Sequence, residues 1–286
     1  MTTTASLEAG RRFVEREGRL LERRIAASLF GGEDPAGALG ALMGYRNEDG
    51  GFGHGLEPDK RAPASQPLDV EVAFSVMECV GRVDEGAVTA ACDFLASIGP
   101  GVGCLVGGAL DFPRAPHWGE GAVVPSLNPT AGIVAHLWRW GVGHPWREAA
   151  TAFCWDELER GLPTESHTFG EVLAFLDAVF DQSRAQAFVG QLGSCTSRLE
   201  VFRHDPADPS YGVTPVHFAP SPASRWLALF DPDLVEAHLD ALVAAQCDDG
   251  GWPISWETIG PAAVQEYRGV ETLRALRTLR SFDRLA

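Results

Sequence analysis

The stretch Gln246-Cys247-Asp248-Asp249-Gly250-Gly251-Trp252-Pro253 ends an apolar helical run and has a near copy 200 positions earlier, Arg46-Asn47-Glu48-Asp49-Gly50-Gly51-Phe52-Gly53. In both copies a leucine lies four residues before the first position. Paired glycines let the backbone adopt the positive φ at which helices end. We therefore expect each copy to end a helix, with its aromatic ring covering the helix end and Gln246 bonding exposed backbone groups. An internal repeat of this kind predicts a repeated architecture.

Outside the two copies the chain reads as a series of helices, with proline at their starts and glycine at their ends. Residues 6–30 carry apolar positions against many Arg and Glu, which predicts one amphipathic helix. Residues 67–80 are apolar nearly all round, which predicts a helix buried on both sides. Eleven helices and no strand are expected, apart from a short hairpin near 102–110. A second helix is predicted from Asp34-Pro35 to the first glycine turn. The later helices are predicted at 85–97, 128–140, 145–161, 167–180, 183–197, 221–230, 231–246 and 260–280.

Buried and amphipathic helices alternate along the chain, which predicts an inner ring of helices within an outer ring. Such an all-α toroid of the (α/α)6 type needs about twelve helices, and its first and last helices meet. A linear helical solenoid is the alternative, and it predicts a more regular spacing of the inner helices. No low-complexity linker or composition break divides the chain, so residues 1–286 are expected to form a single domain.

The second copy, Gln246 to Trp252 with Leu242 before it, resembles the QW repeat of squalene and terpene cyclases and of protein prenyltransferase β subunits. That family folds as an α/α toroid, so the resemblance implies the same fold, similar to a stand-alone β domain of a class II terpene cyclase. The first copy departs from the repeat, because Arg46 replaces Gln and Phe52 replaces Trp. In the family the motif holds helices together, so it implies architecture more than a reaction.

Composition restricts the partners and the compartment. The chain of 286 residues is 45% hydrophobic and 22% charged, as in globular proteins with a sizeable core. Its formal net charge of −16 gives no general attraction for nucleic acid or an anionic membrane surface. No apolar run approaches the ~20 residues that span a bilayer, and no signal peptide is visible. Six cysteines without C-x-x-C spacing read as buried reduced thiols, so a cytoplasmic protein is expected. Its oligomeric state is left open.

Asp69 and Glu71 stand at the start of the apolar helix expected at 67–80. Class II terpene cyclases begin an inner helix with Asp-x-Asp-Asp, whose middle Asp protonates an alkene or epoxide. Asp69 matches the first position, Glu71 replaces the middle acid and Val72 replaces the last. The resemblance implies that Glu71 is the acid, and a carboxyl in a dry cavity has the raised pKa that this chemistry requires. Alternatively, Asp69 stabilises the helix dipole and Glu71 is solvated or paired.

Glu57 and Asp59 follow the first Gly-Gly-Phe turn directly, with His54 before them and Lys60, the only lysine, after them. Pro58 fixes φ between the two acids and stiffens their separation. An acid/base pair at the mouth of a cavity is one interpretation. A charged loop that caps the following helix is the other.

Histidine and aromatic residues gather on the long loops 98–127 and 198–220 and near the expected starts of inner helices. In terpene cyclases aromatic faces stabilise carbocations by cation–π attraction. The alternative is that these side chains fill a helical core. We expect the following residues to bind substrate, with Tyr211 as a further candidate for the wall: His54, His117, Trp118, Asn128, His167, His217, Trp252 and Trp256.

Several activities lack their motifs. There is no Asp-Asp-x-x-Asp for a magnesium-diphosphate site, no zinc-ligand set of the prenyltransferase or lanthionine cyclase kind, and no P-loop or dinucleotide-binding fingerprint. No metal and no cofactor is predicted. The expected partner is a hydrophobic small molecule.

The expected function is therefore an enzyme similar to a class II terpene cyclase. It would bind an isoprenoid-type substrate in a central cavity and protonate it with Glu71, Asp69, Asp59 or Glu57. A carbohydrate-active toroid hydrolase or lyase is the first alternative, with Glu57 and Asp59 or Asp69 as acid and base and Trp faces against sugars. A non-catalytic scaffold is the second. An apolar closed cavity favours the isoprenoid, an open acidic cleft favours the sugar, and a filled centre favours the scaffold.

Overall fold

The computed structural model describes residues 4–286, which form α-helices, short 3-10 turns and isolated bridges without a strand. The all-α class is thereby confirmed, with twelve α-helices in these residues where eleven were expected. Their bounds are α1 (Leu7–Glu17), α2 (Leu20–Gly31), α3 (Ala36–Leu42), α4 (Pro67–Val80), α5 (Glu85–Ile98), α6 (Leu127–Trp140), α7 (Pro145–Arg160), α8 (Ser166–Ala178), α9 (Gln182–Leu192), α10 (Pro215–Phe218), α11 (Pro232–Ala244) and α12 (Pro261–Ser281).

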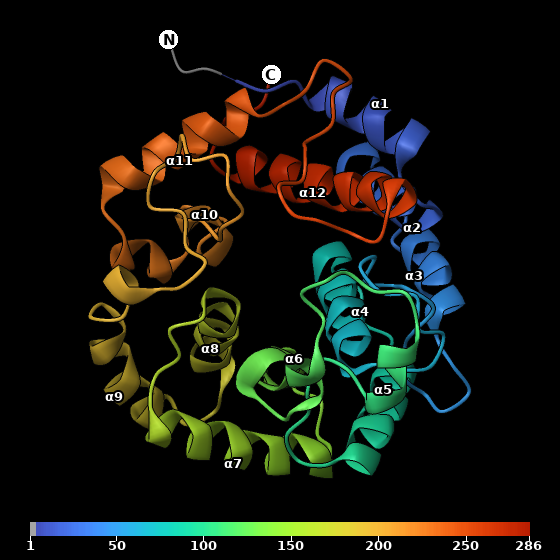
Figure 1. Cartoon of the computed structure of the whole chain (residues 1–286), viewed down its shortest axis with the longest axis vertical. Coiled ribbons are helices and arrows are strands. Elements are labelled where there is room, and N and C mark those ends of the chain that lie inside the picture. The colour runs from blue at the N-terminus through green and yellow to red at the C-terminus, as the bar shows by residue number, and fades with distance from the viewer. Residues whose placement is uncertain (1–3) are drawn as a thin grey trace.

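Figure 1 shows the helices placed around a ring, with α5, α7, α9 and α11 on its outside and α4, α6, α8 and α12 nearer its centre. The even-numbered helices pack against one another in sequence: α12 against α2, α2 against α4, α4 against α6, α6 against α8, and α8 against α10. They form the inner layer, and each is joined to its outer neighbour by a short connection or a long loop. In Figure 1 the long loops cross the face nearest the viewer.

The two ends of the described chain meet beside α1 and α12. Ala5 pairs with Leu285 in a parallel bridge, and the Ala5 amide donates to the Arg284 carbonyl at 3.0 Å. Gln246 completes this junction: its side-chain amide donates to the Ser6 carbonyl (2.9 Å), and its Oε1 accepts the Ser6 amide (2.7 Å). Gln246 thus bonds exposed backbone groups as expected: Ser6 lies at the start of α1, 240 residues away, and the Gly250 carbonyl of its own turn accepts a further bond at 3.0 Å.

The two copies of the glycine turn have the same backbone geometry. Gly50 and Gly250 take φ of 90° and 92°. A Cβ at Gly50 would lie 2.5 Å from the Ala90 carbonyl oxygen, and one at Gly250 would lie 2.3 Å from the Ala9 carbonyl oxygen. Glycine is therefore required at both positions by backbone conformation and by close packing on the neighbouring outer helix. Trp252 covers its own helix end as expected, because its indole N–H donates to the Leu242 carbonyl at 2.8 Å.

The segment expected as one helix over 6–30 is two helices. Gly18 lies between them in an extended conformation, and its N–H donates to the Val14 carbonyl at 2.9 Å. The Arg19 guanidinium then donates to the carbonyls of Gly55 and Leu56 at 3.0 and 2.9 Å. Because the first helix ends at Glu17, α1 and α2 take different places in the ring. The outer helix α1 packs on α12, and α2 lies in the inner layer between α12 and α4.

Two further expectations in the long loops were wrong. No hairpin forms near 102–110, because Val102 bonds Ser126 and the Thr130 side chain, while Gly107–Asp111 form a 3-10 turn. The segment 221–230 carries only the 3-10 turn Arg225–Leu229. The helix at this point of the ring is α10, inside the stretch expected as a loop, and it is short enough to have no readable periodicity.

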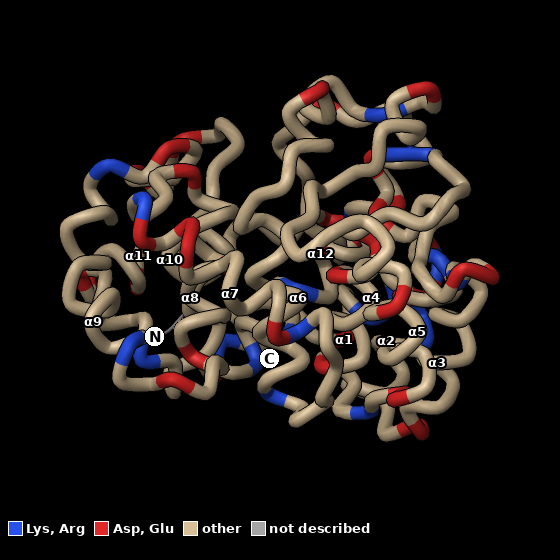
Figure 2. Tube along the Cα trace, turned by 90° about the horizontal axis from the view of Figure 1, so that it is seen from below, with Lys and Arg blue, Asp and Glu red and all other residues tan. Residues whose placement is uncertain are grey.

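Within residues 4–286, no helix combines the length and the apolar character that a bilayer crossing requires. Figure 2 shows Asp and Glu positions on the loops at one end of the ring and beside α4 and α12.

Candidate functional site

Loops on one end of the ring bring together a histidine and two aromatic side chains from distant parts of the chain. His167 begins α8, Tyr211 precedes α10, and Trp256 lies on the loop before α12. The rings of His167 and Tyr211 stack with centroids 5.9 Å apart, and Tyr211 meets Trp256 edge to face at 5.2 Å. His167 and Trp256 were expected to bind substrate, and the structure places them on either side of Tyr211.

Glu165, His167 and Tyr211 form a hydrogen-bonded relay. Glu165 Oε1 lies 2.5 Å from His167 Nδ1, and His167 Nε2 lies 2.6 Å from the Tyr211 hydroxyl. Burial acts to raise the pKa of Glu165, but hydrogen bonds from His167 and the Thr168 amide hold it at about 2. The ionised carboxylate keeps a proton on Nδ1, so Nε2 accepts a hydrogen bond from the tyrosine. Burial raises the pKa of Tyr211 to about 12, and the hydroxyl is therefore neutral.

Asp59 lies on the far side of Trp256. The indole N–H of Trp256 donates to Asp59 Oδ2 at 2.8 Å, and His117 Nε2 lies 3.8 Å from the same oxygen. Asp59 is 1% exposed, and its other carboxylate oxygen is buried without a hydrogen-bond partner among residues 4–286. Burial raises the pKa of Asp59 and lowers the pKa of His117. The carboxylate thus orients Trp256 and faces a histidine that is half exposed.

The loop that carries Asp59 also carries a buried ionic network. Lys60 is fully buried, and its ammonium contacts Asp69 Oδ1 and lies 3.9 Å from Glu57 Oε2. Asp69 Oδ1 also accepts the Glu57 amide at 2.8 Å, and the hydroxyl of Tyr267 on α12 donates to Glu57. Burial raises the pKa of Glu57 to about 7. Asp69 and Lys60 have no exposed surface, and their ion pair holds the loop in place.

A pocket of about 470 Å³ opens beside the relay. Tyr211 and Trp256 line it, together with the ion pair of Arg274 and Glu271 on α12. Its volume lies within the range of small-molecule sites. Further lining residues are Arg203, His217, His238 and Trp252. The walls therefore combine aromatic faces with charged and neutral hydrogen-bonding groups.

Glu71 lies elsewhere, in a second cavity of about 420 Å³ that shares His217 with the first. Ser75 donates to Glu71 Oε1 at 2.9 Å, and Glu171 of α8 lines the same cavity. Burial raises the pKa of Glu71, and burial together with the Glu71 charge raises that of Glu171. The four predicted acids are thus divided: Glu57, Asp59 and Asp69 share one network, and Glu71 is apart from them.

The remaining predicted substrate-binding residues have packing or capping contacts. His54 is exposed and bonds the Asn47 side chain at 2.8 Å. Trp118 packs on a small apolar cluster, and Asn128 forms the kinked entry of α6 with its oxygens near the Cys104 sulfur. His217 caps α10 while lining both cavities, and Trp252 is largely buried beside its helix end.

The relay residue Glu165 and the α12 residues Tyr267 and Arg274 were not predicted. Glu165 carries a local signal, because it is an acidic residue at the N-cap of α8 and accepts the His167 and Thr168 amides. Tyr267 and Arg274 lie within α12, where polar and apolar residues alternate along the whole helix. Their neighbours in the sequence therefore give no signal that distinguishes them as site residues.

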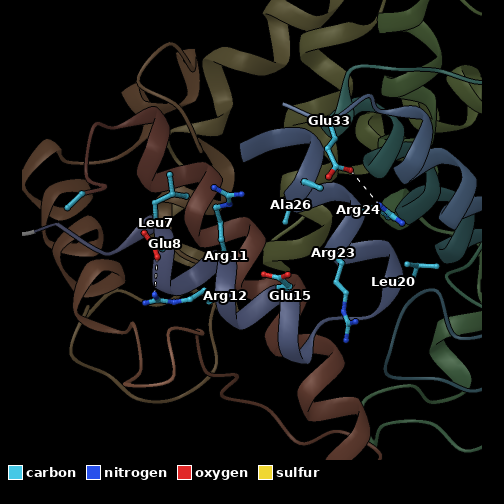
Figure 3. Close-up of a pocket in the computed structure, with 12 residues that line it drawn as sticks. Leu7, Glu8, Arg11, Arg12, Glu15, Leu20, Arg23, Arg24, Ala26 and Glu33 are labelled. Atoms are coloured by element: carbon cyan, nitrogen blue, oxygen red, sulfur yellow. Dashed lines mark hydrogen bonds and ion pairs between the residues drawn. The ribbon is translucent and has the colours of Figure 1, made fainter. Parts of the chain in front are cut away.

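A further surface hollow lies apart from this site. It is a groove of about 830 Å³ on the outside of α1 and α2. Figure 3 shows Arg11, Arg12, Glu15 and Arg23 along it, with Arg12 bonded to Glu8. Opposite charges alternate there as on an ordinary solvated helix face, and none of the described residues that line the groove is aromatic.

No family model, curated protein or solved structure matches this chain.

Proposed function

We propose that this protein is a carbohydrate-active enzyme that works by general acid–base catalysis in the 470 Å³ pocket. The observation that carries the proposal is the relay of Glu165, His167 and Tyr211, which ends with a hydroxyl on the pocket wall. A small polar substrate, no metal and a cytoplasmic location belong to the same proposal.

The relay is built to accept a proton. A substrate hydroxyl, a water or an acidic C–H gives its proton to the Tyr211 oxygen while the tyrosine proton passes to His167 Nε2. The ionised Glu165 then stabilises the imidazolium. A positioned acid or base of this kind contributes about 10²–10⁴-fold to a rate. Proton removal from water leads to hydrolysis, and proton removal from carbon leads to elimination.

The lining of the pocket supports a sugar-type ligand. Trp256 and Tyr211 offer aromatic surface for the C–H face of a sugar ring, and Arg274, Glu271 and His217 offer partners for hydroxyl groups. Arg274 and Glu271 pair with each other, but a hydrocarbon chain would leave the remaining hydrogen-bonding atoms of these groups without partners, at a cost of about 1–3 kcal/mol for each such atom. The pocket therefore favours the carbohydrate alternative over an isoprenoid.

Protonation-initiated cyclisation is the second candidate, and one observation favours it. Glu71 faces the second cavity, and burial raises its pKa, as a carboxylic acid that protonates an alkene requires. His136, Arg139 and Asp177 line the same cavity, so its polar character opposes an isoprenoid. In this second candidate Glu71 is the acid that protonates the substrate. In the carbohydrate proposal Glu71 takes no part in the reaction.

Tyr211→Phe tests the two candidates directly. The purified chain is assayed against neutral and acidic oligosaccharides for new reducing ends and unsaturated products, and against isoprenoid substrates for cyclic products. We expect sugar turnover, and a fall in kcat of about 10²–10⁴-fold in Tyr211→Phe with little change in KM.

Tyr267→Phe is the matched control, because this tyrosine also packs on Trp256 but donates to the buried Glu57. It should lose far less activity. Full sugar turnover in Tyr211→Phe would refute the relay. Cyclic isoprenoid products that vanish in Glu71→Gln would instead establish the second candidate.

A further inference from the structure

We propose that Ser75, His136 and Glu78 form a serine-nucleophile site in the second cavity, which hydrolyses small esters that carry a cationic group. Ser75 and Glu78 lie three residues apart on α4, and His136 lies on the neighbouring inner helix α6. Ser75 and His136 both line the cavity of about 420 Å³. The site contains none of the relay residues, so it does not depend on the function proposed above.

The three side chains have the contacts of a nucleophile, a general base and an orienting acid. Ser75 Oγ lies 3.3 Å from His136 Nε2, and His136 Nδ1 contacts Glu78 Oε2. In unliganded enzymes the bond between nucleophile and base is often long, because it tightens only in the complex with substrate. The His136 ring stacks on Trp140 with centroids 5.2 Å apart and meets Phe74 edge to face at 6.2 Å. These contacts hold the ring with Nε2 toward the serine.

Glu78 keeps the histidine in the tautomer that a base requires. Arg139 Nη1 donates to both carboxylate oxygens of Glu78 at 2.7 Å. Burial acts to raise the pKa of Glu78, but the hydrogen bond from His136 and the charges of His136 and Arg139 hold it below its usual value. The ionised carboxylate keeps a proton on Nδ1, so Nε2 is free to accept the Ser75 proton.

The Ser75 hydroxyl has a second partner, because Glu71 Oε1 lies 2.9 Å from its oxygen. An ionised Glu71 accepts the serine proton, whereas a protonated Glu71 donates to the serine oxygen and leaves that proton to His136. Burial raises the pKa of Glu71. Glu171 lines the same cavity, and an ionised carboxyl group opposes the ionisation of its neighbour. A substrate that pairs with an ionised Glu171 therefore keeps Glu71 protonated and frees the Ser75 proton for His136.

The lining of the cavity indicates what that substrate carries. A Cβ at Gly132 would overlap the Glu171 carboxylate, so this carboxylate lies against α6 one turn before His136. Arg139 also lines the cavity, but its charge is paired with Glu78. Buried charges in folded proteins are paired. An ammonium group on the substrate supplies the counter-charge that Glu171 lacks among residues 4–286.

The reaction is ester hydrolysis in two steps. Ser75 Oγ attacks the carbonyl carbon while its proton passes to His136 Nε2, and Arg139 offers N–H groups to the carbonyl oxygen as it becomes negative. The bond to the alcohol oxygen breaks, and this oxygen takes the proton from His136, which leaves the acyl group on Ser75. Water then attacks the acyl carbon and gives a proton to His136. The carboxylic acid departs as Ser75 regains its proton.

Covalent labelling of the full chain tests the nucleophile. Diisopropyl fluorophosphate phosphorylates an activated serine with loss of fluoride, and peptide mapping by mass spectrometry identifies the serine. We expect the label on Ser75 and its loss in Ser75→Ala. Ser224 is the matched control, because it lines the same cavity and its hydroxyl bonds the Trp226 amide in place of a histidine. Ser224→Ala should be labelled at the wild-type rate.

Variants of the two partners separate a catalytic role from a structural one. His136→Gln and Glu78→Gln should each slow the labelling about 10²–10⁴-fold. In Glu78→Gln the histidine stays in place, so kcat for an ester should fall while KM changes little. Melting curves show whether each variant is folded. Absence of the label from Ser75, or an unchanged labelling rate in both variants, would overturn the site.

The substrate class is tested with two esters of the same shape. Acetylcholine carries a quaternary ammonium group, and 3,3-dimethylbutyl acetate has an uncharged carbon in its place. We expect kcat/KM to be higher for acetylcholine by about tenfold or more, and Glu171→Gln should remove this preference. Equal values for the two esters in the wild-type chain would overturn the assignment of a cationic substrate.

Discussion

The two glycine turns share a backbone and differ in what the chain does next. At 46–53 and at 246–253 the fifth residue has positive φ and the sixth donates to the preceding aspartate, at 3.0 Å in both. Gln246 then ties the second turn to Ser6, which holds the ends of the ring together. Arg46, its counterpart, is exposed, and Asn47 bonds the loop instead. The same local structure closes the ring at one place and supports the candidate site at the other.

The loops that follow the two turns have different surroundings. Glu57 and Glu257 occupy equivalent positions 200 residues apart. Glu57 is buried between Lys60 and Tyr267, whereas Glu257 is exposed. A repeat therefore determines the turn but not the surroundings of the residues that follow it, because those depend on which helix lies opposite.

The largest expected effect comes from breaking the turns themselves. Gly50→Ala and Gly250→Ala should each destabilise the fold by about 3 kcal/mol or more, because positive φ is combined with a backbone clash. Urea unfolding measures the change. Gly81→Ala is the control, because Gly81 has φ of 69° with open space around it, and it should cost about 1 kcal/mol. Equal costs at all three sites would show that the close packing is unimportant.

The pH dependence of the unfolding free energy tests the difference in burial between Glu57 and Glu257. The pKa of Glu57 is raised from 4.5 to about 7, so its stabilising contribution is complete below pH 4.5 and is lost as pH rises through 7. That loss amounts to about 3 kcal/mol. Glu57→Gln should therefore flatten the unfolding free energy between pH 5 and 8.

Glu257→Gln is the matched control and should leave the wild-type pH profile unchanged, because its side chain is exposed. Chemical denaturation of the three proteins at several pH values makes the comparison. Parallel profiles for wild type and Glu57→Gln would mean that the Glu57 carboxyl is not buried in solution.

The smallest effect concerns the first residue of each turn. Gln246→Ala removes two hydrogen bonds to Ser6 at the start of α1 and one to the Gly250 carbonyl of its own turn, and it should cost about 2 kcal/mol. Arg46→Ala should change stability by less than about 0.5 kcal/mol, because Arg46 is exposed. Amide exchange near Ser6 should speed up only in Gln246→Ala. A similar cost for both would remove the assigned difference between the turns.

Most helices were predictable because their signals are local. Proline begins α4, α7, α11 and α12, and the resulting bounds match the expected ones closely. The break at Gly18 was missed because the amphipathic pattern continues through it and only contacts with the loop at 55–56 separate the helices. The short α10 was missed because four residues are too few to show a period.

Individual residues of the candidate site could be predicted from the sequence, but the contacts between them could not. Asp59, His117, His167 and Trp256 were singled out as residue types that suit a site. The bond between His167 and Tyr211 joins residues 44 apart, and no spacing rule links them. Likewise Asp69 and Glu71 are two residues apart on α4 but have different surroundings: Asp69 belongs to a buried ionic network, and Glu71 lines the second cavity.

The all-α class, the two glycine turns and most helix ends follow from the sequence, because they depend on backbone preferences within a few residues. Which polar side chains share a pocket and which are buried follows from the packing of the whole chain. Both properties depend on helices far apart in the chain. Tyr211 reaches His167, and Tyr267 covers Glu57, because the loops before α8 and α10 and the helix α12 meet at one end of the ring.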